Sequence, residues 1–368
     1  MSRTADIAIV GGGLVGSALA YGLASRGASV LMFDPDADDL HASVGNFGLV
    51  WVQSKGVGAP DYAALSRRSA AAWTDFAADI AGRSGKNPAY DRCGGIKIAL
   101  GDSEMEALEA SVRRLHNQGS DDVVMISREE LVDRVPSVGP EAVGGSYCAA
   151  DGHADPLATH IALRIALRTT ARAAVVRRRV DGIAPDGDGF TVLAEGERFG
   201  AGKVVLAAGH GTTALAAMLG LDVPLRPERG QILVTERLAP FLGPACFTVR
   251  QTNQGSVLIG DSKEDVGFDR GTTPEVGGAM AERALRMFPC LADARIVRQW
   301  GALRVMSPDG LPIYAQSRTH PGAMSLSCHS GVTLAAAHAG EVAEAVLSGT
   351  LAARYPAFSP DRFAKVTA

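Results

Sequence analysis

The sequence predicts an α/β fold in which a domain built on a parallel sheet is interrupted by a second domain with a mainly antiparallel sheet. Three observations lead to this prediction. A glycine-rich turn joins a buried strand to a helix near the N-terminus, within residues 6–33. Buried strands and apolar helices of the same character return in residues 156–209 and again after residue 300. The stretches between these regions have a different, strand-rich texture, which indicates insertions.

The first element is a run of buried-strand residues that leads directly into a G-x-G-x-x-G turn at Gly11, Gly13 and Gly16. An apolar helix is predicted over residues 14–25, and a second strand over residues 29–33 ends in Asp34. This order is typical of a Rossmann-like dinucleotide-binding unit, in which the glycines allow a tight turn, a close pyrophosphate and close helix packing. The helix N-terminus attracts phosphate, and Asp34 can bind a ribose. Because the chain has 43 glycines, an ordinary glycine-rich turn is the alternative.

The second and third regions supply further elements of the same domain. The second begins with a predicted helix over residues 156–171 and continues with strand-like runs at 174–176, 180–183 and 190–193. A buried strand over 203–209 then ends in small residues, as a close backbone approach requires. The third region runs from Trp300 to the C-terminus and includes an alanine-rich helix predicted over residues 331–347.

Two insertions separate these regions. The first has a strand-like run at 95–100 and helical runs at 103–117 and 127–132. The second has strand-like runs at 230–236, 247–251 and 256–259, then a helix from about residue 275 to 287. We therefore predict a discontinuous cofactor domain made of residues 1–84, 150–220 and 300–368, with a substrate-binding cap made of residues 85–149 and 221–299.

The composition excludes several classes of function. The 36 basic and 40 acidic residues give a net charge of −4, which argues against bulk binding of nucleic acid. The five cysteines form no C-x-x-C pair, so we expect no iron–sulfur cluster, no bound metal, and reduced thiols in a cytoplasmic protein. Glycines and Arg26 break the apolar stretch of residues 7–33, so we expect no membrane span.

Taken together, the motifs resemble those of the D-amino-acid-oxidase-like FAD-dependent oxidoreductases, which include glycine oxidase, sarcosine oxidase and D-amino-acid dehydrogenases. The resemblance covers nearly the whole chain. It rests on the glycine turn with Asp34, on D-G-H-A-D-P at 151–156, V-V-L-A-A-G at 204–209, R-G-Q at 229–231, and on the segment 303–312. Within the family, residues 45–53 and 328–334 are most similar to FAD-bearing subunits of opine oxidases, hydroxyproline dehydrogenases and hydrogen-cyanide synthase.

The resemblance implies a fold of the glutathione-reductase/D-amino-acid-oxidase type, with FAD as the cofactor. Cofactor-type segments at both ends of the chain suit an extended FAD better than a nicotinamide. The expected cofactor-binding residues are Gly11, Gly13, Leu14, Val15, Gly16, Asp34, Ser43, Asn46, Phe47, Gly48, Leu49, Val180, Ala208, Gly209, Arg304, Ser330, Gly331, Val332 and Thr333. A turn residue between two glycines is the alternative for Asn46.

The family also sets expectations for how the flavin is held. Residues 329–333 are expected to open the final helix, whose amide groups would stabilise negative charge on the reduced flavin. Some relatives attach the flavin through a cysteine after the arginine segment or through a histidine in the early segment. Residues 305–307 contain no cysteine and residues 43–48 contain no histidine, so we expect non-covalent FAD.

Arg304 and His329 are the expected catalytic residues. Arg304 matches the family's carboxylate-binding arginine, because a planar guanidinium can hold a carboxylate with two hydrogen bonds; a surface salt bridge is the alternative. His329 is expected to orient the reactants, and a buried structural histidine is the alternative. Arg304, Arg250 and Trp51 are the expected substrate-binding residues. Residues 248–251 lack the tyrosine of glycine oxidase, which leaves room for a larger, N-substituted amino acid.

The resemblance therefore implies an enzyme that removes a hydride from a carbon bearing nitrogen in a small amino-acid-like substrate and leaves an imine, with flavin N5 as the acceptor. Partner subunits that carry FMN or iron–sulfur clusters would suit a dehydrogenase complex. Two alternatives stay open. One is an FAD-dependent 2-hydroxyacid dehydrogenase, and the other is a non-catalytic FAD-bearing assembly subunit.

Overall fold

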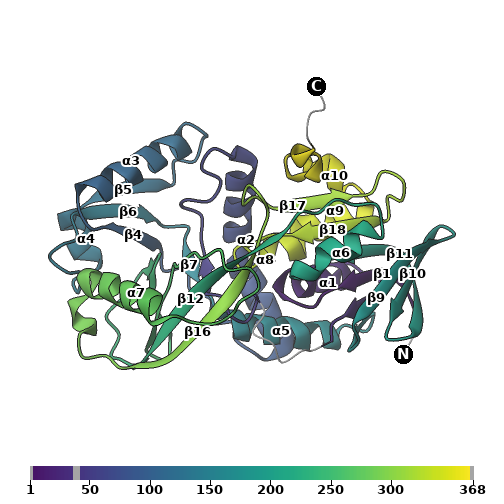
Figure 1. Cartoon of the computed structure of the whole chain (residues 1–368), viewed down its shortest axis with the longest axis horizontal. Coiled ribbons are helices and arrows are strands. Elements are labelled where there is room, and N and C mark those ends of the chain that lie inside the picture. Colours follow the sequence, from purple (N-terminus) through teal and green to yellow (C-terminus); the bar gives the residue numbers. More distant parts are fainter. Residues whose placement is uncertain (1–2, 36–41, 365–368) are drawn as a thin grey trace.

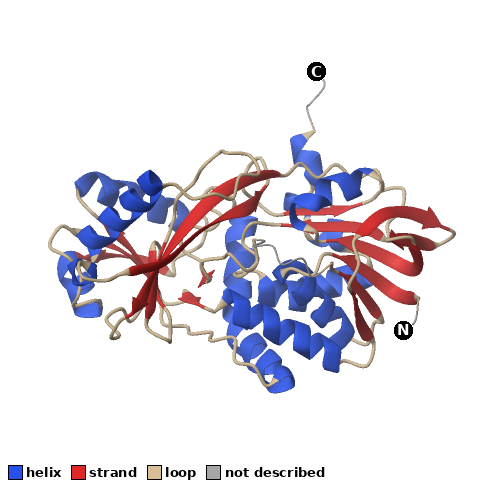
Figure 2. Cartoon of the chain, turned by 60° about the horizontal axis from the view of Figure 1, so that its bottom comes forward, coloured by secondary structure: helices blue, strands red, loops and turns tan. Residues whose placement is uncertain are grey.

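The computed structural model describes residues 3–35 and 42–364, and it has two lobes (Figure 1). The lobe on the right of the figure contains a large sheet, and the lobe on the left contains two smaller ones. Figure 2 shows long strands that run from one lobe toward the other, and these are the pair β12 (Arg226–Arg237) and β16 (Ile296–Met306). None of the described helices is long and apolar enough to cross a membrane.

The large sheet has eight strands, and five of them run parallel in the order β18–β11–β1–β2–β8. Strand β17 flanks β18, and the hairpin β9–β10 continues from β11. The strands are β1 (Thr4–Val10), β2 (Val30–Phe33), β8 (Ala173–Val176), β9 (Val180–Asp186), β10 (Gly189–Ala194), β11 (Glu197–Leu206), β17 (Ile313–Gln316) and β18 (Ala323–Ser327). Residues 7–10 and 30–33 are all buried, as expected for parallel strands covered on both faces.

Helices pack around this sheet. They are α1 (Leu14–Ser25), α2 (Pro60–Ser84), α5 (Pro156–Thr169), α6 (Thr212–Ala217), α8 (Ala335–Ala337), α9 (Ala343–Ser348) and α10 (Leu351–Arg354). Helix α1 packs against α5 and α9, and α2 packs against α5 and α8. A π-type turn at His338–Val342 joins α8 to α9. Its Ala339 carbonyl accepts a 2.8 Å hydrogen bond from Arg26 and lies where a Cβ on Gly22 would come within 2.1 Å, so α1 can cross here only at a glycine.

The second lobe contains two four-stranded sheets that share one core. The first has the order β14–β15–β12–β16 and the second the order β13–β4–β6–β5, and only the β13–β4 pair is parallel. The remaining elements are β4 (Gly95–Ala99), β5 (Val123–Ser127), β6 (Gly144–Cys148), β13 (Ala245–Cys246), β14 (Val249–Gln251), β15 (Ser256–Ile259), α3 (Asp102–His116), α4 (Arg128–Arg134) and α7 (Pro274–Met287). Ile96, Leu233 and Met287 belong to the apolar cluster that joins the sheets. The predicted fold class is confirmed.

The largest difference from the sequence prediction is α2, a 25-residue helix that we did not predict. Strands β5 and β6 were also missed. The final helix begins at Ala335 rather than at residue 331: residues 331–334 form a turn, although the Leu334 amide already donates a helix-type hydrogen bond to the Ser330 carbonyl at 2.9 Å. An alanine-rich sequence favours helix wherever it lies, so the pattern gave no sign of this later start.

Strand β16 affects where the last boundary between the two predicted domains is placed. It pairs with β12 from Ile296 to Met306, so a boundary at residue 300 would fall inside a strand of the second lobe. We propose to place that boundary after Met306 and to keep the other limits as predicted. The small pair β3 (Leu49–Val50) and β7 (Gly152–His153) then lies within the cofactor domain.

Candidate functional site

The turn between β1 and α1 is closed by glycines that have no room for a side chain. Gly11 has a φ of +108°, and a Cβ there would lie 2.3 Å from the carbonyl oxygen of Ala207. A Cβ on Gly16 would lie 1.9 Å from the carbonyl oxygen of Gly11. Among the described residues, a Cβ on Gly13 would meet only the side chain of Ser43, with its hydroxyl at 2.8 Å. Gly11 and Gly16 are therefore required by the fold, whereas Gly13 leaves its backbone open to a ligand.

The first turn of α1 is suited to an anion. Its N-cap is Gly13, no side chain caps it, and it contains no acidic residue. The Leu14 amide donates a 2.9 Å hydrogen bond to the Ser43 hydroxyl, which holds the segment that begins at residue 42 against the turn. The other free amides of this first turn and the positive end of the helix dipole favour a phosphate.

Asp34 lies beside the same turn, at the end of β2. Its Oδ2 accepts a 2.6 Å hydrogen bond from the Gly12 amide, and its own amide donates to the Val176 carbonyl at 3.0 Å. Val180 packs in the apolar cluster that contains Phe33, so the start of β9 and the end of β2 share one core. The structure thus brings the predicted ribose-binding residue Asp34 and the predicted cofactor-binding residue Val180 to one corner of the sheet.

Ala208 and Gly209 follow β11, which ends beside the glycine turn. The Ala207 amide donates to the Val10 carbonyl at 2.8 Å, and a Cβ on Gly11 would lie only 2.7 Å from the Cα of Ala208. The strand end, the turn and the helix start therefore form one continuous backbone surface. This is the surface that the predicted phosphate-binding residues share.

The predicted flavin segments 45–53 and 329–333 meet although they are about 280 residues apart. The Thr333 hydroxyl accepts a 3.1 Å hydrogen bond from the Trp51 amide and donates to the Leu49 carbonyl at 3.2 Å. Asn46 forms a turn through its side-chain oxygen, which accepts from the Gly48 amide at 2.8 Å, and it also lines the cavity described below. Both expectations for Asn46 are therefore compatible with its position.

Helix α2 fixes the second of these segments. The Trp73 indole donates to the carbonyls of Val332 and Thr333 at 3.0 and 3.1 Å, and the Ser69 hydroxyl donates to the Thr333 carbonyl at 2.7 Å. The Tyr62 hydroxyl lies 2.5 Å from the Ser330 hydroxyl. None of these α2 residues was singled out from the sequence, because their role depends on contacts about 260 residues away.

A cavity of about 610 Å³ lies between these segments and the β12–β16 pair. It brings together Trp51, Arg304 and His329, as predicted. It is also lined by residues that the sequence analysis did not select as site residues, among them Lys55, Lys97, Glu228, Gln231, Phe247, Asp261, Lys263 and Met306. The predicted residues Asn46, Phe47, Leu49, Ser330, Val332 and Thr333 complete this wall of the cavity.

Arg304 is held in place by the neighbouring strand and the loop after β15. Its Nη1 donates to the Ser262 carbonyl at 2.8 Å and lies 3.3 Å from a carboxylate oxygen of Glu228, its direct partner in the β12–β16 register. The guanidinium lies against Gly230, where a Cβ would come within 2.7 Å of its carbon. Its side chain keeps 28% of its exposure, and both of these contacts are made by Nη1, so part of the guanidinium can still meet a substrate.

His329 lies in the cavity as a neutral imidazole. Burial, together with the positive charges of Lys55, Arg304 and Lys263, holds the pKa of His329 well below its usual value. Its Nδ1 lies 3.2 Å from the Ser330 hydroxyl. A neutral, hydrogen-bonded ring with a fixed orientation suits the positioning role predicted for it.

Lys55 is the most informative residue that the sequence analysis missed. Its Nζ donates a 2.9 Å hydrogen bond to the Ser330 hydroxyl, and it lines the same cavity as Arg304. Withdrawal from solvent lowers the pKa of Lys55 to about 8, and the charges of Arg304 and Lys263 act in the same direction. The only available sign in the sequence is a lysine three positions after the apolar run of residues 49–52.

Arg250 does not line this cavity. It is 4% exposed and lies behind Gly48, where a Cβ would come within 3.2 Å of its guanidinium carbon. Its Nη1 is 3.5 Å from Nδ1 of His153, and burial, together with this charge, lowers the pKa of His153 to about 4. The substrate-binding role predicted for Arg250 has no support from its position.

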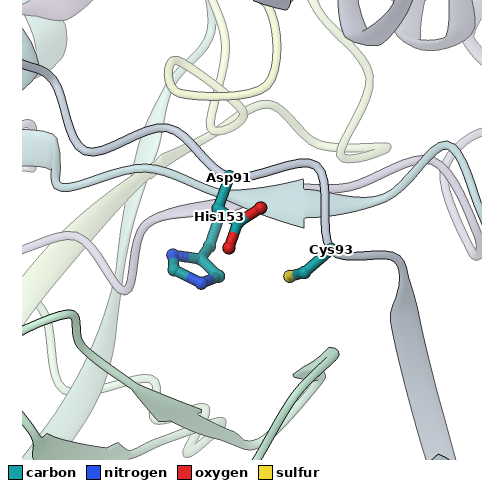
Figure 3. Close-up of side chains that lie close together, drawn as sticks. All are labelled: Asp91, Cys93 and His153. Carbon is teal, nitrogen blue, oxygen red and sulfur yellow. The ribbon is translucent and has the colours of Figure 1, made fainter.

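His153 also belongs to a group of possible metal ligands with Asp91 and Cys93 (Figure 3). Their ligand atoms lie within 4.8 Å of one another. Burial raises the pKa of the Cys93 thiol to about 11, and the Arg250 guanidinium lies beside the imidazole. A protonated thiol and a neighbouring positive charge both oppose a bound cation, so we assign no metal to this group.

The site fits an extended flavin dinucleotide. The glycine turn offers an open backbone at Gly13 and the end of β2 offers the Asp34 carboxylate, both on the phosphate and ribose side. At the other end, the indole nitrogen of Trp51 is buried and has no hydrogen-bond partner within the part of the chain that the structure describes. Such an orphaned buried donor beside a cavity is expected where a polar ligand completes the site.

Comparisons with known proteins agree with this geometry. The family profile described as FAD dependent oxidoreductase matches residues 6–345. The chain is 41% identical to the B subunit of opine oxidase from Rhizobium meliloti, over 97% of each chain, and 28% identical to the HcnC subunit of hydrogen cyanide synthase from Pseudomonas aeruginosa, over 85% of each. It superposes on the crystal structure of glycine oxidase from Geobacillus kaustophilus with a TM-score of 0.86 and 25% identity, covering 94% of this chain and 95% of that one.

The chain therefore belongs to the family of FAD-dependent oxidoreductases of the D-amino-acid-oxidase type. The predicted family, the FAD cofactor and the enzyme class are confirmed. The assignments of individual residues stay predictions.

Proposed function

We propose that this protein oxidises the C–N bond of an N-substituted amino acid that carries more than one carboxylate, as in an opine, and that it serves as the FAD-bearing catalytic subunit of a dehydrogenase complex. The observation that carries the proposal is the charge of the cavity. Four cationic side chains, Lys55, Lys97, Lys263 and Arg304, line it against two carboxylates, Glu228 and Asp261. With His329 neutral, the cavity favours an anionic substrate.

Arg304 supplies the clamp for one carboxylate. Its guanidinium is fixed by Ser262 and Glu228, so little freedom is lost when a carboxylate binds to the remaining N–H groups. A fixed carboxylate fixes the carbon next to it, which is the carbon that loses hydride. The other cations give a second carboxylate a favourable environment, which a simple amino acid such as glycine would not use.

The residues that would hold FAD are those of the glycine turn, Asp34, the segment after Ser43 and the segment 329–333. When bound, FAD supplies the electron acceptor for a two-electron oxidation. The chain's own residues bind the substrate, fix its orientation and exclude water. The amide groups of residues 331–333 lie next to the cavity wall and are suited to stabilise negative charge there.

The proposal of a complex rests on the relatives. The opine oxidase relative and the HcnC relative are, by their names, subunits of larger enzymes. We propose that electrons leave this chain for a partner subunit that carries FMN or an iron–sulfur cluster, because this chain has no cysteine motif for a cluster of its own.

An anaerobic absorbance titration of the purified FAD-bound protein tests the reaction class. Matched pairs of compounds would be used: an amino acid and its N-(1-carboxyalkyl) derivative, a D- and an L-amino acid, an amine and the corresponding 2-hydroxyacid. We expect the flavin band to bleach with the N-carboxyalkyl compounds at concentrations where the parent amino acids have no effect. Bleaching by 2-hydroxyacids alone would overturn the amine reaction, and bleaching by none of them would favour a non-catalytic subunit.

A further inference from the structure

Lys55 has an unusual environment for a lysine that lines a charged cavity. Its Nζ is hydrogen-bonded to the Ser330 hydroxyl at 2.9 Å. No carboxylate among the described residues lies within ion-pair distance of it, although Glu228 pairs with Arg304 in the same cavity. Because no described carboxylate forms an ion pair with it, the Lys55 amine can lose and regain a proton more easily than a lysine held in an ion pair.

The groups around Lys55 come from every element that surrounds it. They are Tyr62 on α2, Cys328 and His329 after β18, Arg304 on β16, Lys263 after β15, and Asp151 before β7. Burial raises the pKa of the Cys328 thiol to about 12 and that of the Asp151 carboxyl to about 7. Near pH 8 the Cys328 thiol is therefore neutral and Asp151 is largely ionised, while Arg304 and Lys263 are positive. Burial and these two cations outweigh the attraction of Asp151 and keep the pKa of Lys55 low.

The hydrogen bonds of Ser330 decide which group can accept a proton. While it is charged, the Lys55 ammonium has no lone pair, so it can act only as the donor to Ser330. The Tyr62 hydroxyl is buried and Ser330 is its one hydrogen-bond partner among the described residues; we assign Tyr62 as the donor, because a buried O–H left without an acceptor is costly. The single proton of Ser330 is then left for Nδ1 of His329. Nδ1 therefore accepts from Ser330 and the neutral ring carries its own proton on Nε2, so His329 has no free lone pair with which to take a proton from the substrate.

We propose that Lys55 is the proton acceptor of the site, which takes the proton from the ammonium nitrogen of the bound substrate before the C–H bond breaks. This step rests on the proposed function. The balance is simple: a substrate R₂NH₂⁺ and a neutral Lys55 amine give R₂NH and a Lys55 ammonium, with no change in oxidation state. The freed nitrogen lone pair can then support departure of the hydride.

The local charges favour this transfer. With its pKa lowered to about 8, roughly half of the Lys55 amine is neutral at pH 8. The ammonium that forms stays hydrogen-bonded to Ser330. Burial lowers the pKa of Lys97 as well, but two neighbours oppose this and make Lys97 a less suitable acceptor: its Nζ lies 4.8 Å from the centre of the Phe247 ring, and the Asp261 carboxylate stabilises its charge.

The first test measures binding and needs no turnover. Acetate is titrated into the FAD-bound protein at several pH values while the flavin spectrum is followed. We expect acetate to bind several-fold more weakly as the pH rises through about 8, because the charge of Lys55 disappears. A Lys55→Met variant should bind weakly at every pH, and a Lys55→Arg variant should bind well at every pH. The same pH dependence in all three proteins would overturn the proposal.

The second test measures the rate of flavin reduction by substrate without oxygen. In the wild type the rate should rise through pH 8. In Lys55→Arg, which keeps the charge but cannot release its proton, it should fall by about 100-fold or more and lose this inflection. Lys263→Met is the matched control, because it removes a cavity charge but leaves Lys55; its inflection should persist and move to higher pH. A Lys55→Arg rate within threefold of the wild type would refute the role.

The two proposals fail in different ways. If no amine reduces the wild-type flavin, the proposed function fails, while the acetate titration still reports whether Lys55 carries the titrating charge. If amines reduce the wild type and all variants alike, the function stands and the role of Lys55 does not. Bound FAD and thermal midpoint are measured for every variant, and Lys55→Gln replaces Lys55→Met if the latter does not fold.

Discussion

The guanidinium of Arg304 lies against the backbone of Gly230, on the neighbouring strand of the β12–β16 pair. A Cβ on Gly230 would come within 2.7 Å of the guanidinium carbon and of Nη2. Because Gly230 has no side chain, the Arg304 guanidinium can lie directly against the backbone of β12. The position of Arg304 in the cavity therefore depends on a glycine at residue 230.

The substitution Gly230→Ala should displace Arg304 without disturbing the sheet, since alanine is readily accommodated in a strand. We expect the KM for a carboxylate substrate to rise roughly 10-fold, equivalent to about 1.4 kcal/mol. Steady-state kinetics and a thermal midpoint would measure this. Gly278→Ala is the control, because Gly278 is exposed on α7 with no atom within 4 Å of its Cβ position. An unchanged KM in Gly230→Ala would contradict the clamp.

The glycine turn allows binding and folding to be separated. Gly13→Ala should fold, because only the side chain of Ser43 has to move, but it should bind FAD at least 10-fold more weakly. Gly16→Ala should unfold or aggregate, because its Cβ would lie 1.9 Å from the carbonyl oxygen of Gly11. Circular dichroism and the flavin-to-protein absorbance ratio distinguish the two. Normal FAD content in Gly13→Ala would contradict the phosphate site.

Acid should destabilise the fold through its buried histidines. Burial lowers the pKa of His338 to about 3, from an unfolded value near 6.5. Between these values the unfolded chain binds a proton and the native chain does not. The neutral His338 therefore makes its full contribution to the free energy of unfolding above pH 6.5. Below that pH the contribution falls, and at pH 5.5 it is smaller by about 1.4 kcal/mol.

Urea unfolding at pH 7.5 and pH 5.5 measures this effect. The loss of unfolding free energy between the two pH values should be about 1.4 kcal/mol smaller in His338→Asn than in the wild type. His320→Asn, at an exposed position, should keep the wild-type loss. Equal losses in both variants would show that His338 does not account for the effect.

The flavin should be released when the protein is denatured. Acid precipitation is expected to leave FAD in the supernatant and a colourless pellet, because residues 305–307 contain no cysteine and residues 43–48 no histidine. Absorbance of both fractions is the measurement. A yellow pellet would show a covalent bond, for which Cys328, beside Lys55 in the site, would be the first residue to examine.

The sequence by itself determined the nucleotide-binding unit. The predicted helix over residues 14–25 matches α1, and Gly11, Gly16 and Asp34 take the positions that the motif requires. These features could be predicted because each depends on neighbours close in the chain: a strand period, a turn and a helix start. The residues recognised by resemblance, such as Arg304 and His329, also reached the cavity.

Only the tertiary structure decided which other side chains share that cavity. Lys55, Tyr62 and Ser330 come from a loop, from a helix that we did not predict, and from a turn about 270 residues further on. No local sequence motif marks any of the three, since a lysine or a tyrosine does not by itself indicate a functional site. Their function depends on the hydrogen bonds and the loss of solvent that long-range packing imposes, and no local pattern encodes those.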